Sequence, residues 1–212
     1  MPANFVSGIT INELYNPPAE PGPDYNGDGK SDSGDLFIEL YNANPTDVNL
    51  DGWEIWVNDE RQMRFTSDHT IAADGRFVVV SPVAGTAHPI QNVVGPAVYA
   101  DDWMLFGRTS VISLYDPGAN AFFMVAGRWS GSYDLYADAI QAAHPGAEWI
   151  GNDPEWGFGK VEFFGDLDNF AGYSFQRVTD GADDLTSIRL ANPGAPNCFA
   201  PGTMIATPLG EV

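Results

Sequence analysis

The sequence has little cysteine and little positive charge. Cys198 is its only cysteine, and 9 Lys and Arg residues stand against 29 Asp and Glu, which gives a formal net charge of −20. A single cysteine excludes an internal disulfide, which suits the cytosol and also suits export by a route that avoids oxidative folding. A surface this acidic repels the phosphates of nucleic acids and of anionic membranes, so we expect neither as a partner.

Long apolar stretches are missing as well. Residues 1–8 carry neither the basic segment nor the apolar segment of a secretory signal peptide. No apolar run approaches the roughly 20 residues that a membrane-spanning helix needs. We therefore predict no membrane segment and no N-terminal signal.

The residues that are present favour short strands joined by turns. The 212-residue chain is 44% hydrophobic and 13% aromatic, with 23 Gly and 16 Pro, and it is long enough for one domain with a substantial core. Alternating or β-branched segments separated by turn residues predict an antiparallel β-sandwich. Strands are expected at 9–14, 36–41, 52–58, 61–66, 77–80, 103–106, 110–115, 121–126, 161–164 and 173–178. One helix is expected at 134–143, capped by Asp134 and stopped by the turn residues 144–146.

Several segments resemble lamin-tail domains. They are Phe37–Asn42 (FIELYN), Asp51–Trp56 (DGWEIW), Ile71–Pro82, and the ending formed by Ser174–Val178 and Asn192–Asn197. The resemblance extends over residues 9–197 and implies an all-β fold, an immunoglobulin-like antiparallel β-sandwich of lamin-tail type. Residues 83–172 match poorly and are interpreted as later strands that carry insertions. The resemblance implies a display or binding role and no catalytic residues.

An acidic loop at 24–35 has the spacing of an EF-hand calcium loop. Oxygen ligands stand at loop positions 1, 3, 5, 9 and 12, the backbone carbonyl of position 7 would add one more, and a glycine stands at position 6, where the chain must turn sharply. These residues are Asp24, Asn26, Asp28, Asp32, Asp35, Lys30 (through its carbonyl) and Gly29. Asp replaces the usual Glu at position 12, and no flanking helices are expected. The sequence predicts a calcium site inserted between strands, with a weak Kd of about 10⁻⁴–10⁻³ M; the alternative is a turn that binds no metal.

A second acidic turn contains Asp166 and Asp168. It offers too few ligands for a full calcium shell, so a second metal site there is the less favoured interpretation.

The last residues resemble the start of a Hint (Hedgehog/intein) domain. The run Cys198–Pro208 (CFAPGTMIATP) carries this resemblance, which implies that Cys198 is a nucleophile attacking the scissile carbonyl of Asn197. The family's later Thr-x-x-His motif is not found in residues 198–212, so we expect no enzyme activity from this chain and self-cleavage or splicing only in a full-length parent. The predicted division is an N-terminal tail at 1–8, the sandwich at 9–191, a linker at 192–197 and a truncated start of a Hint domain at 198–212.

Together these features predict a non-catalytic, calcium-binding interaction or display module. The resemblance implies a secreted bacterial protein, exported to the extracellular space without an N-terminal signal peptide, with an unknown protein or glycan partner. One alternative is that the sandwich is the N-terminal cargo (extein) of an autoprocessing, intein-like protein. Another is a carbohydrate- or surface-binding module, for which Trp149 and Trp156 are the candidate sugar platforms, although core packing is the commoner fate of tryptophan.

Overall fold

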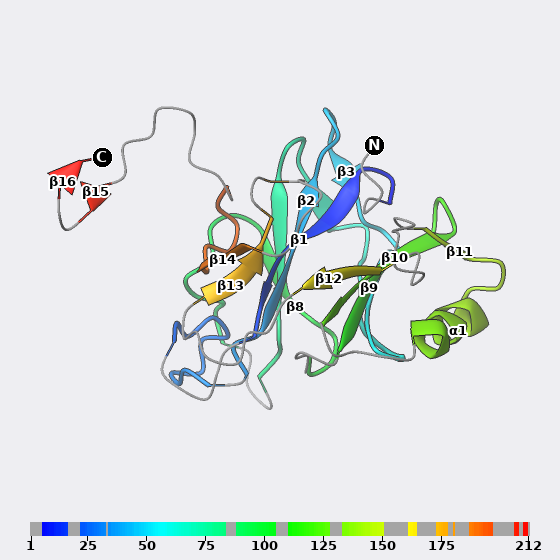
Figure 1. Cartoon of the computed structure of the whole chain (residues 1–212), viewed down its shortest axis with the longest axis horizontal. Coiled ribbons are helices and arrows are strands. Elements are labelled where there is room, and N and C mark those ends of the chain that lie inside the picture. The colour runs from blue at the N-terminus through cyan, green and yellow to red at the C-terminus, as the bar shows by residue number, and fades with distance from the viewer. Residues whose placement is uncertain are drawn as a thin grey trace.

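Sixteen strands and one helix make up the secondary structure of the described residues (Figure 1). The computed structural model describes residues 6–16, 22–32, 34–83, 88–104, 110–127, 133–150, 161–164, 173–177, 180, 187–196, 206–207 and 210–211. The strands are Ile9–Tyr15 (β1), Phe37–Asn42 (β2), Val48–Asn49 (β3), Glu54–Val57 (β4), Glu60–Arg64 (β5), Thr70–Ile71 (β6), Arg76–Val80 (β7), Ala97–Tyr99 (β8), Val111–Asp116 (β9), Ala121–Gly127 (β10), Glu148–Trp149 (β11), Val161–Phe164 (β12), Tyr173–Gln176 (β13), Ser187–Leu190 (β14), Ala206–Thr207 (β15) and Gly210–Glu211 (β16). The helix, α1, is Tyr133–Ala143.

The first sheet has the strand order β14-β13-β1-β2-β7-β8. Its pairings are antiparallel except for β7 with β8, which run parallel. A bulge between Ile11 and Glu13 shifts the register of β1 against β2, after which Glu13 stands directly opposite Glu39. The first sheet therefore places two carboxylates side by side on neighbouring strands.

The second sheet has the order β11-β10-β9-β4-β5, with β12 also pairing to β10. Strands β11 and β12 both run parallel to β10 and pair with different parts of it. Parallel neighbours need a crossover connection, and α1 supplies the one between β10 and β11. Two short pairs, β3–β6 and β15–β16, form separate two-stranded sheets.

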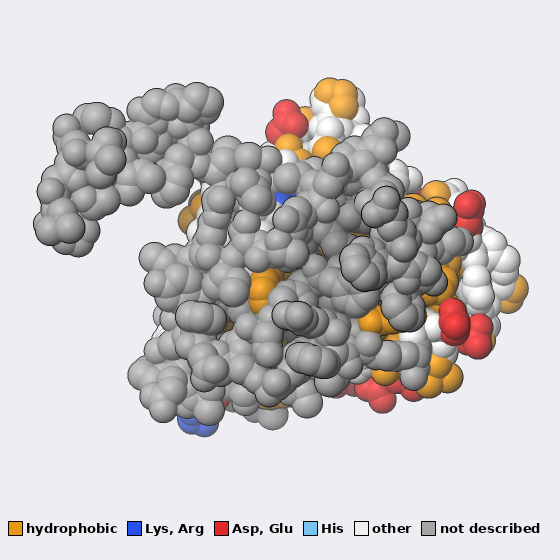
Figure 2. All heavy atoms as spheres, viewed as in Figure 1, with side chains coloured by type: hydrophobic (Ala, Val, Ile, Leu, Met, Phe, Trp, Pro, Cys, Tyr) orange, Lys and Arg blue, Asp and Glu red, His pale blue; other side chains and the backbone are white. Residues whose placement is uncertain are grey.

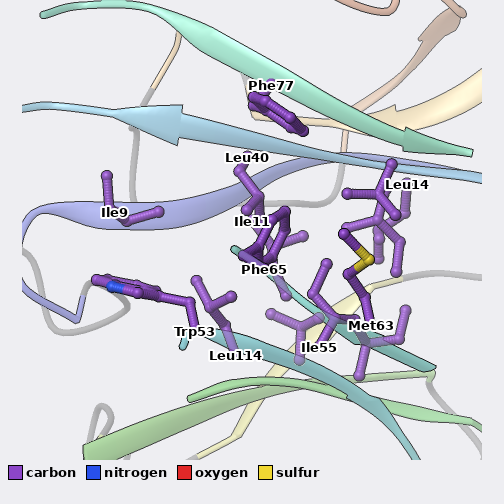
Figure 3. Close-up of a cluster of buried hydrophobic side chains, with 14 of the residues drawn as sticks. Ile9, Ile11, Leu14, Leu40, Trp53, Ile55, Met63, Phe65, Phe77 and Leu114 are labelled. Carbon is purple, nitrogen blue, oxygen red and sulfur yellow. The ribbon is translucent and has the colours of Figure 1, made fainter. Parts of the chain in front are cut away.

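The main core lies between the two sheets (Figure 3). Because side chains alternate along a strand, β2 turns Ile38 and Leu40 into this core and places Phe37 and Glu39 on the opposite face. The second sheet contributes residues such as Ile55 and Leu114 from below. The result is a sandwich whose core is apolar from both sides.

Both outer faces of the sandwich are also partly covered. On the outer face of the first sheet, Tyr15, Phe37, Val78 and Val80 pack with Tyr25 of the following loop. On the outer face of the second sheet, α1 buries Ala137 and Ile140 against a cluster that contains Trp56, Tyr115 and Phe122. Polar residues on outward-facing strand positions, such as Glu39 and Glu54, are fully buried as well.

The predicted all-β sandwich is confirmed, and most predicted strands appear within one or two residues of the expected bounds. Two details differ. Residues 103 and 104 of the strand predicted at 103–106 are not in a strand, and residues 105 and 106 lie outside the described residues. The helix begins at Tyr133, so Asp134 lies in its first turn, where a carboxylate favours the positive helix end without being its cap. The helix ends at Ala143 as expected, and Gly146 follows with φ +81°.

The ends of the packed domain extend beyond the predicted sandwich. Val6, placed in the N-terminal tail from the sequence, is buried in the core and pairs with Ile9. Pro193 and Gly194, placed in the linker, lie against the first sheet, where the Pro193 carbonyl accepts a hydrogen bond from Val94 N at 2.9 Å. Among the described residues, no helix is long and apolar enough to cross a membrane.

Candidate functional site

The acidic loop connects β1 to β2 and lies at one end of the first sheet. Asp24 is held there by Asn92, whose Nδ2 donates to the Asp24 carbonyl at 2.8 Å. The Tyr25 carbonyl accepts from Gln91 N at 3.0 Å. The Tyr25 ring is buried and packs edge-on against Tyr15 and Phe37, with ring centroids 5.2 and 5.1 Å away. The loop is therefore anchored by an aromatic core of its own.

Each predicted side-chain ligand of the loop accepts a hydrogen bond from a backbone N–H within the loop. Asp24 accepts from Gly27 and Gly29 at 2.6 and 2.9 Å. Asn26 Oδ1 accepts from Asp28 N at 3.1 Å, and Asp28 Oδ1 accepts from Lys30 N at 2.8 Å. These bonds fix the rotamers of the oxygen donors, as hydrogen bonds to metal-ligating carboxylates do.

The second half of the loop follows the same pattern. Asp32 Oδ1 accepts from Gly34 N at 2.8 Å. Asp35 is fully buried and accepts from Tyr25 N at 2.7 Å, Asn26 N at 3.1 Å and Asp32 N at 3.0 Å. Asp35 therefore closes the loop by joining its last position to its second, third and ninth residues.

Gly29 takes the conformation that the sequence analysis expected at position 6. Its φ is +83°, and the space where a Cβ would stand is open. The left-handed backbone disfavours any L side chain there, independent of space. The tight turn of the loop thus depends on this glycine.

The electrostatics of the loop are those of crowded carboxylates. Burial raises the pKa of Asp35, although its backbone hydrogen bonds act in the opposite direction and Asp24 adds repulsion. Burial also raises the pKa of Tyr99, helped by Asp24, Asp28 and Asp35. The one neighbouring cation in the loop is weakly placed, since Lys30 Nζ lies 4.0 Å from Asp28 Oδ2 and is largely exposed. The loop has a local excess of negative charge that a cation would neutralise.

The donor set fits a hard cation such as Ca²⁺, because it consists of carboxylate, amide and carbonyl oxygens. Within the described part of the chain, however, no three Asp, Glu, His or Cys side chains meet closely enough to hold a metal ion. The loop has the oxygen donors and the left-handed glycine that the sequence predicted, and each of its carboxylates accepts from a backbone N–H of the loop. The predicted oxygen ligands thus lie in one loop, but the four carboxylates do not converge on a common point.

Most of the other predicted site residues lie outside the part of the chain that the structure describes. Asn197 and Cys198, the acidic turn with Asp166 and Asp168, and Trp156 lie outside the described residues. Trp149 lies in β11 and stacks on Phe122, with ring centroids 6.2 Å apart, as a packing residue does.

The three histidines are far from forming a shared site. His69 Nδ1 accepts from Thr66 N at 3.0 Å, and the His88 carbonyl accepts from the Tyr99 hydroxyl at 2.8 Å. His144 lies on the other sheet, 2.7 Å from Glu54 and stacked on Tyr115. Within the described residues, the three histidines therefore have separate partners.

The sequence analysis missed a buried pair of carboxylates, Glu13 and Glu39, on the outer face of the first sheet. Glu13 Oε1 accepts from Ser174 Oγ at 2.5 Å, Gln176 Nε2 at 3.1 Å and Asn192 N at 3.1 Å, whereas its Oε2 has no hydrogen-bond partner. Burial raises the pKa of Glu13 to about 7, against those hydrogen bonds.

Glu39 is buried in the same way. It accepts from Asn12 Nδ2 at 2.6 Å and from Gly194 N at 2.5 Å. Burial and the neighbouring Glu13 raise the pKa of Glu39 well above its usual range. The alternation of β1 and β2 could have placed both side chains on one face, but nothing local in the sequence shows that residues 192–194 cover them.

These two sheets, packed face to face around an apolar core, define an immunoglobulin-like β-sandwich. Comparison with protein families gives a match to the Lamin Tail Domain over residues 6–126, more than half of the chain, and the chain belongs to this family. The match runs from the Val6 bridge into β10, so it includes residues 83–126, which the sequence analysis had set apart as poorly matching. A comparison with curated proteins gives no match.

Proposed function

We propose that this chain is a non-catalytic, calcium-binding interaction or display module of a secreted bacterial protein. Family membership supports the interaction role, because the lamin-tail fold is an immunoglobulin-like module. The observation that carries the calcium proposal is the loop 24–35, in which every side-chain oxygen donor is oriented by backbone N–H groups and the turn is made by a left-handed glycine. Figure 2 shows that carboxylate side chains occur at several places around the periphery, in keeping with an acidic module.

Calcium would bind through Asp24, Asn26, Asp28, Asp32 and Asp35, with the Lys30 carbonyl as a further donor. Bound Ca²⁺ would supply no chemistry beyond charge neutralisation and ordering of the loop. The residues themselves hold the loop in shape through Asp35, which ties the end of the loop to its beginning. The expected consequence is a Ca²⁺-dependent gain in stability, because an ion that binds the folded chain alone stabilises it.

A calcium titration followed by thermal unfolding and calorimetry tests this proposal. At ten times the Kd, a single site stabilises the fold by about 1.4 kcal/mol, which corresponds to a rise in Tm of about 3–6 °C for a chain of this size. Asp28→Ala should abolish the rise. Asp138→Ala, which removes an exposed carboxylate on α1, should leave it intact. An unchanged Tm at 10 mM Ca²⁺ in the parent chain would disprove the calcium proposal.

We further propose that the module precedes a self-processing Hint domain in a longer parent, with Cys198 as the nucleophile and Asn197 as the scissile residue. The eleven residues Cys198–Pro208 support this, and the lack of a Thr-x-x-His motif in 198–212 explains why this chain alone should stay intact. Mass spectrometry after incubation with dithiothreitol or hydroxylamine should find only the intact chain. A species that ends at Asn197 would contradict this expectation. If the parent continues into a Thr-x-x-His motif and a terminal His-Asn, the sandwich is instead the cargo of a splicing protein.

A further inference from the structure

Trp103 occupies an unusual position at the end of the sandwich. The segment that carries it links the two sheets: Ala100 N donates to the Val80 carbonyl at 2.9 Å, and Asp101 N donates to the Gln62 carbonyl at 2.9 Å. Met104, the next residue, is fully buried, yet the Trp103 side chain remains 43% exposed. A large aromatic side chain is thus presented to solvent by a backbone that is fixed on both sides.

The Trp103 ring borders an open hollow of about 300 Å³. The hollow is lined by Val57, Asn58, Asp59, Glu60, Gln62 and Trp103. The hairpin between β4 and β5 supplies its floor, and Asn58 holds that hairpin to β9 through two bonds, Asn58 N to the Val111 carbonyl at 2.7 Å and Val111 N to Asn58 Oδ1 at 3.0 Å. Its volume is at the lower end of the about 300–1,000 Å³ typical of small-ligand pockets.

The polar lining of this hollow is available for a ligand. Asp59 and Glu60 are exposed. The Gln62 side chain is 5% exposed, and its Oε1 has no hydrogen-bond partner. Buried amide oxygens are nearly always hydrogen-bonded, so this oxygen would gain a partner if the Gln62 side chain turned toward a donor group in the hollow.

The combination of one flat aromatic face with carboxylates and amides matches a neutral saccharide. The C–H face of a pyranose ring packs against an indole, while its hydroxyl groups donate to carboxylates and amide oxygens and accept from amide N–H groups. Asp59 and Glu60 disfavour phosphates and other anions. The lining contains too few aliphatic groups to select a purely apolar ligand.

The Trp103 ring also contacts the acidic loop. A Cβ built on Gly34 would lie 3.0 Å from Trp103 Cη2, and also 3.0 Å from Asn26 Nδ2 and from Asp32 Oδ1. The tip of the indole therefore lies against the loop at Gly34, beside which the side chains of Asn26 and Asp32 also lie.

We propose that Trp103, Asn58, Asp59, Glu60 and Gln62 form a saccharide-binding site whose aromatic platform is held in place by the acidic loop. The site itself stands on the hollow and its lining. Its dependence on calcium rests on the proposed function of the loop. The experiment below tests the saccharide site and its calcium dependence by separate measurements, so either one can be disproved without the other.

The full chain is first screened against an array of neutral gluco-, manno-, galacto-, xylo- and N-acetylglucosamine oligosaccharides in 10 mM Ca²⁺. Affinity for the best oligosaccharide is then measured by calorimetry and by tryptophan fluorescence. Trp103→Ala should weaken binding by at least about tenfold, as loss of a central aromatic contact does. Glu60→Gln should weaken it by a smaller factor, and Trp103→Phe should retain part of the affinity. Leu135→Ala removes another exposed apolar side chain, on α1, and should change nothing.

Three results would overturn the site: no oligosaccharide binds, binding is unaffected by Trp103→Ala in a variant with unchanged Tm, or the hollow prefers a cationic amine such as choline in a salt-sensitive manner. Replacing Ca²⁺ by EDTA should weaken saccharide binding. Equal affinity in EDTA would overturn the coupling to the loop, and if Ca²⁺ still raises the Tm of the chain, the calcium proposal survives that result.

Discussion

The first sheet is flanked by two groups of carboxylates that are stabilised in opposite ways. In the loop 24–35, most carboxylates are partly exposed, stay close to backbone N–H donors and carry a local excess of negative charge. On β1 and β2, Glu13 and Glu39 face each other in register, fully buried, and their pKa values are raised. In the loop, a bound cation would neutralise the repulsion between carboxylates. The buried pair avoids the same repulsion by staying protonated. Burial decides which solution applies, because desolvation penalises the charged form.

The largest effect expected from this difference is a decrease in stability with rising pH. Glu13 has a pKa of about 7 when folded against a usual value of 4.5. Between these values the folded state binds more protons than the unfolded state, so the contribution of Glu13 to stability is fully present below pH 4.5 and is lost as pH rises through 7. The raised pKa of Glu39 adds a loss of the same sign. Urea denaturation between pH 4.5 and 8.5 measures it.

Asp180 is a further carboxylate near the pair. It accepts a hydrogen bond from Asn12 Nδ2 and forms an ion pair with Arg76 of β7. Glu13→Gln keeps an acceptor for Ser174, Gln176 and Asn192 but removes the titration. The variant should therefore lose the part of the pH dependence that Glu13 contributes, keep the part that the buried Glu39 contributes, and gain stability at pH 8. A stability that rises between pH 5 and 8 in the parent chain would contradict the burial argument.

Asp35 belongs to the loop but is buried like Glu13 and Glu39. Its replacement therefore tests whether burial sets the stability cost of losing a carboxylate. Asp35→Ala leaves three backbone N–H groups without their acceptor, and we expect a loss of about 2–3 kcal/mol without any metal present. Asp28→Ala removes a partly exposed acceptor and should cost less than about 1 kcal/mol under the same conditions. Denaturation in EDTA compares the two variants. Equal losses would show that burial does not distinguish Asp35 from the rest of the loop.

Gly194 and Gly29 provide a smaller but sharper comparison. Both have left-handed backbones, with φ of +82° and +83°. A Cβ at Gly29 meets open space, but one at Gly194 would lie 1.5 Å from the Val94 carbonyl oxygen. Gly29→Ala should cost about 1–2 kcal/mol through conformation alone. Gly194→Ala must also displace the chain that donates to Glu39, so its loss should exceed that of Gly29→Ala by about 1 kcal/mol or more. Equal Tm values for the two variants would show that Gly194 does not hold residues 192–194 against the first sheet.

Local pattern was enough to predict the sandwich, since β2, β7 and β9 have strong alternation or β-branched runs between turns. The loop 24–35 was equally accessible, because its spacing and Gly29 lie within twelve consecutive residues. Trp103 was predicted to lie in a strand because its neighbours are apolar, and only the packing of residues 100–104 across the two sheets shows that its ring is exposed. The Glu13–Glu39 pair depends on a bulge in β1 and on a covering segment some 180 residues away in the chain, neither of which has a local signature.

The attachment of residues 192–194 to the first sheet has a mechanical consequence. Asn192 N and Gly194 N bind Glu13 and Glu39, and Val94 N binds the Pro193 carbonyl. A tensile load applied to the chain beyond Pro196 meets these contacts before it reaches the strands. Because two of them end on titratable carboxylates, the force needed to detach this segment should itself vary with pH. The acidity of the solution should thereby control how firmly residues 192–194 are held against the sandwich.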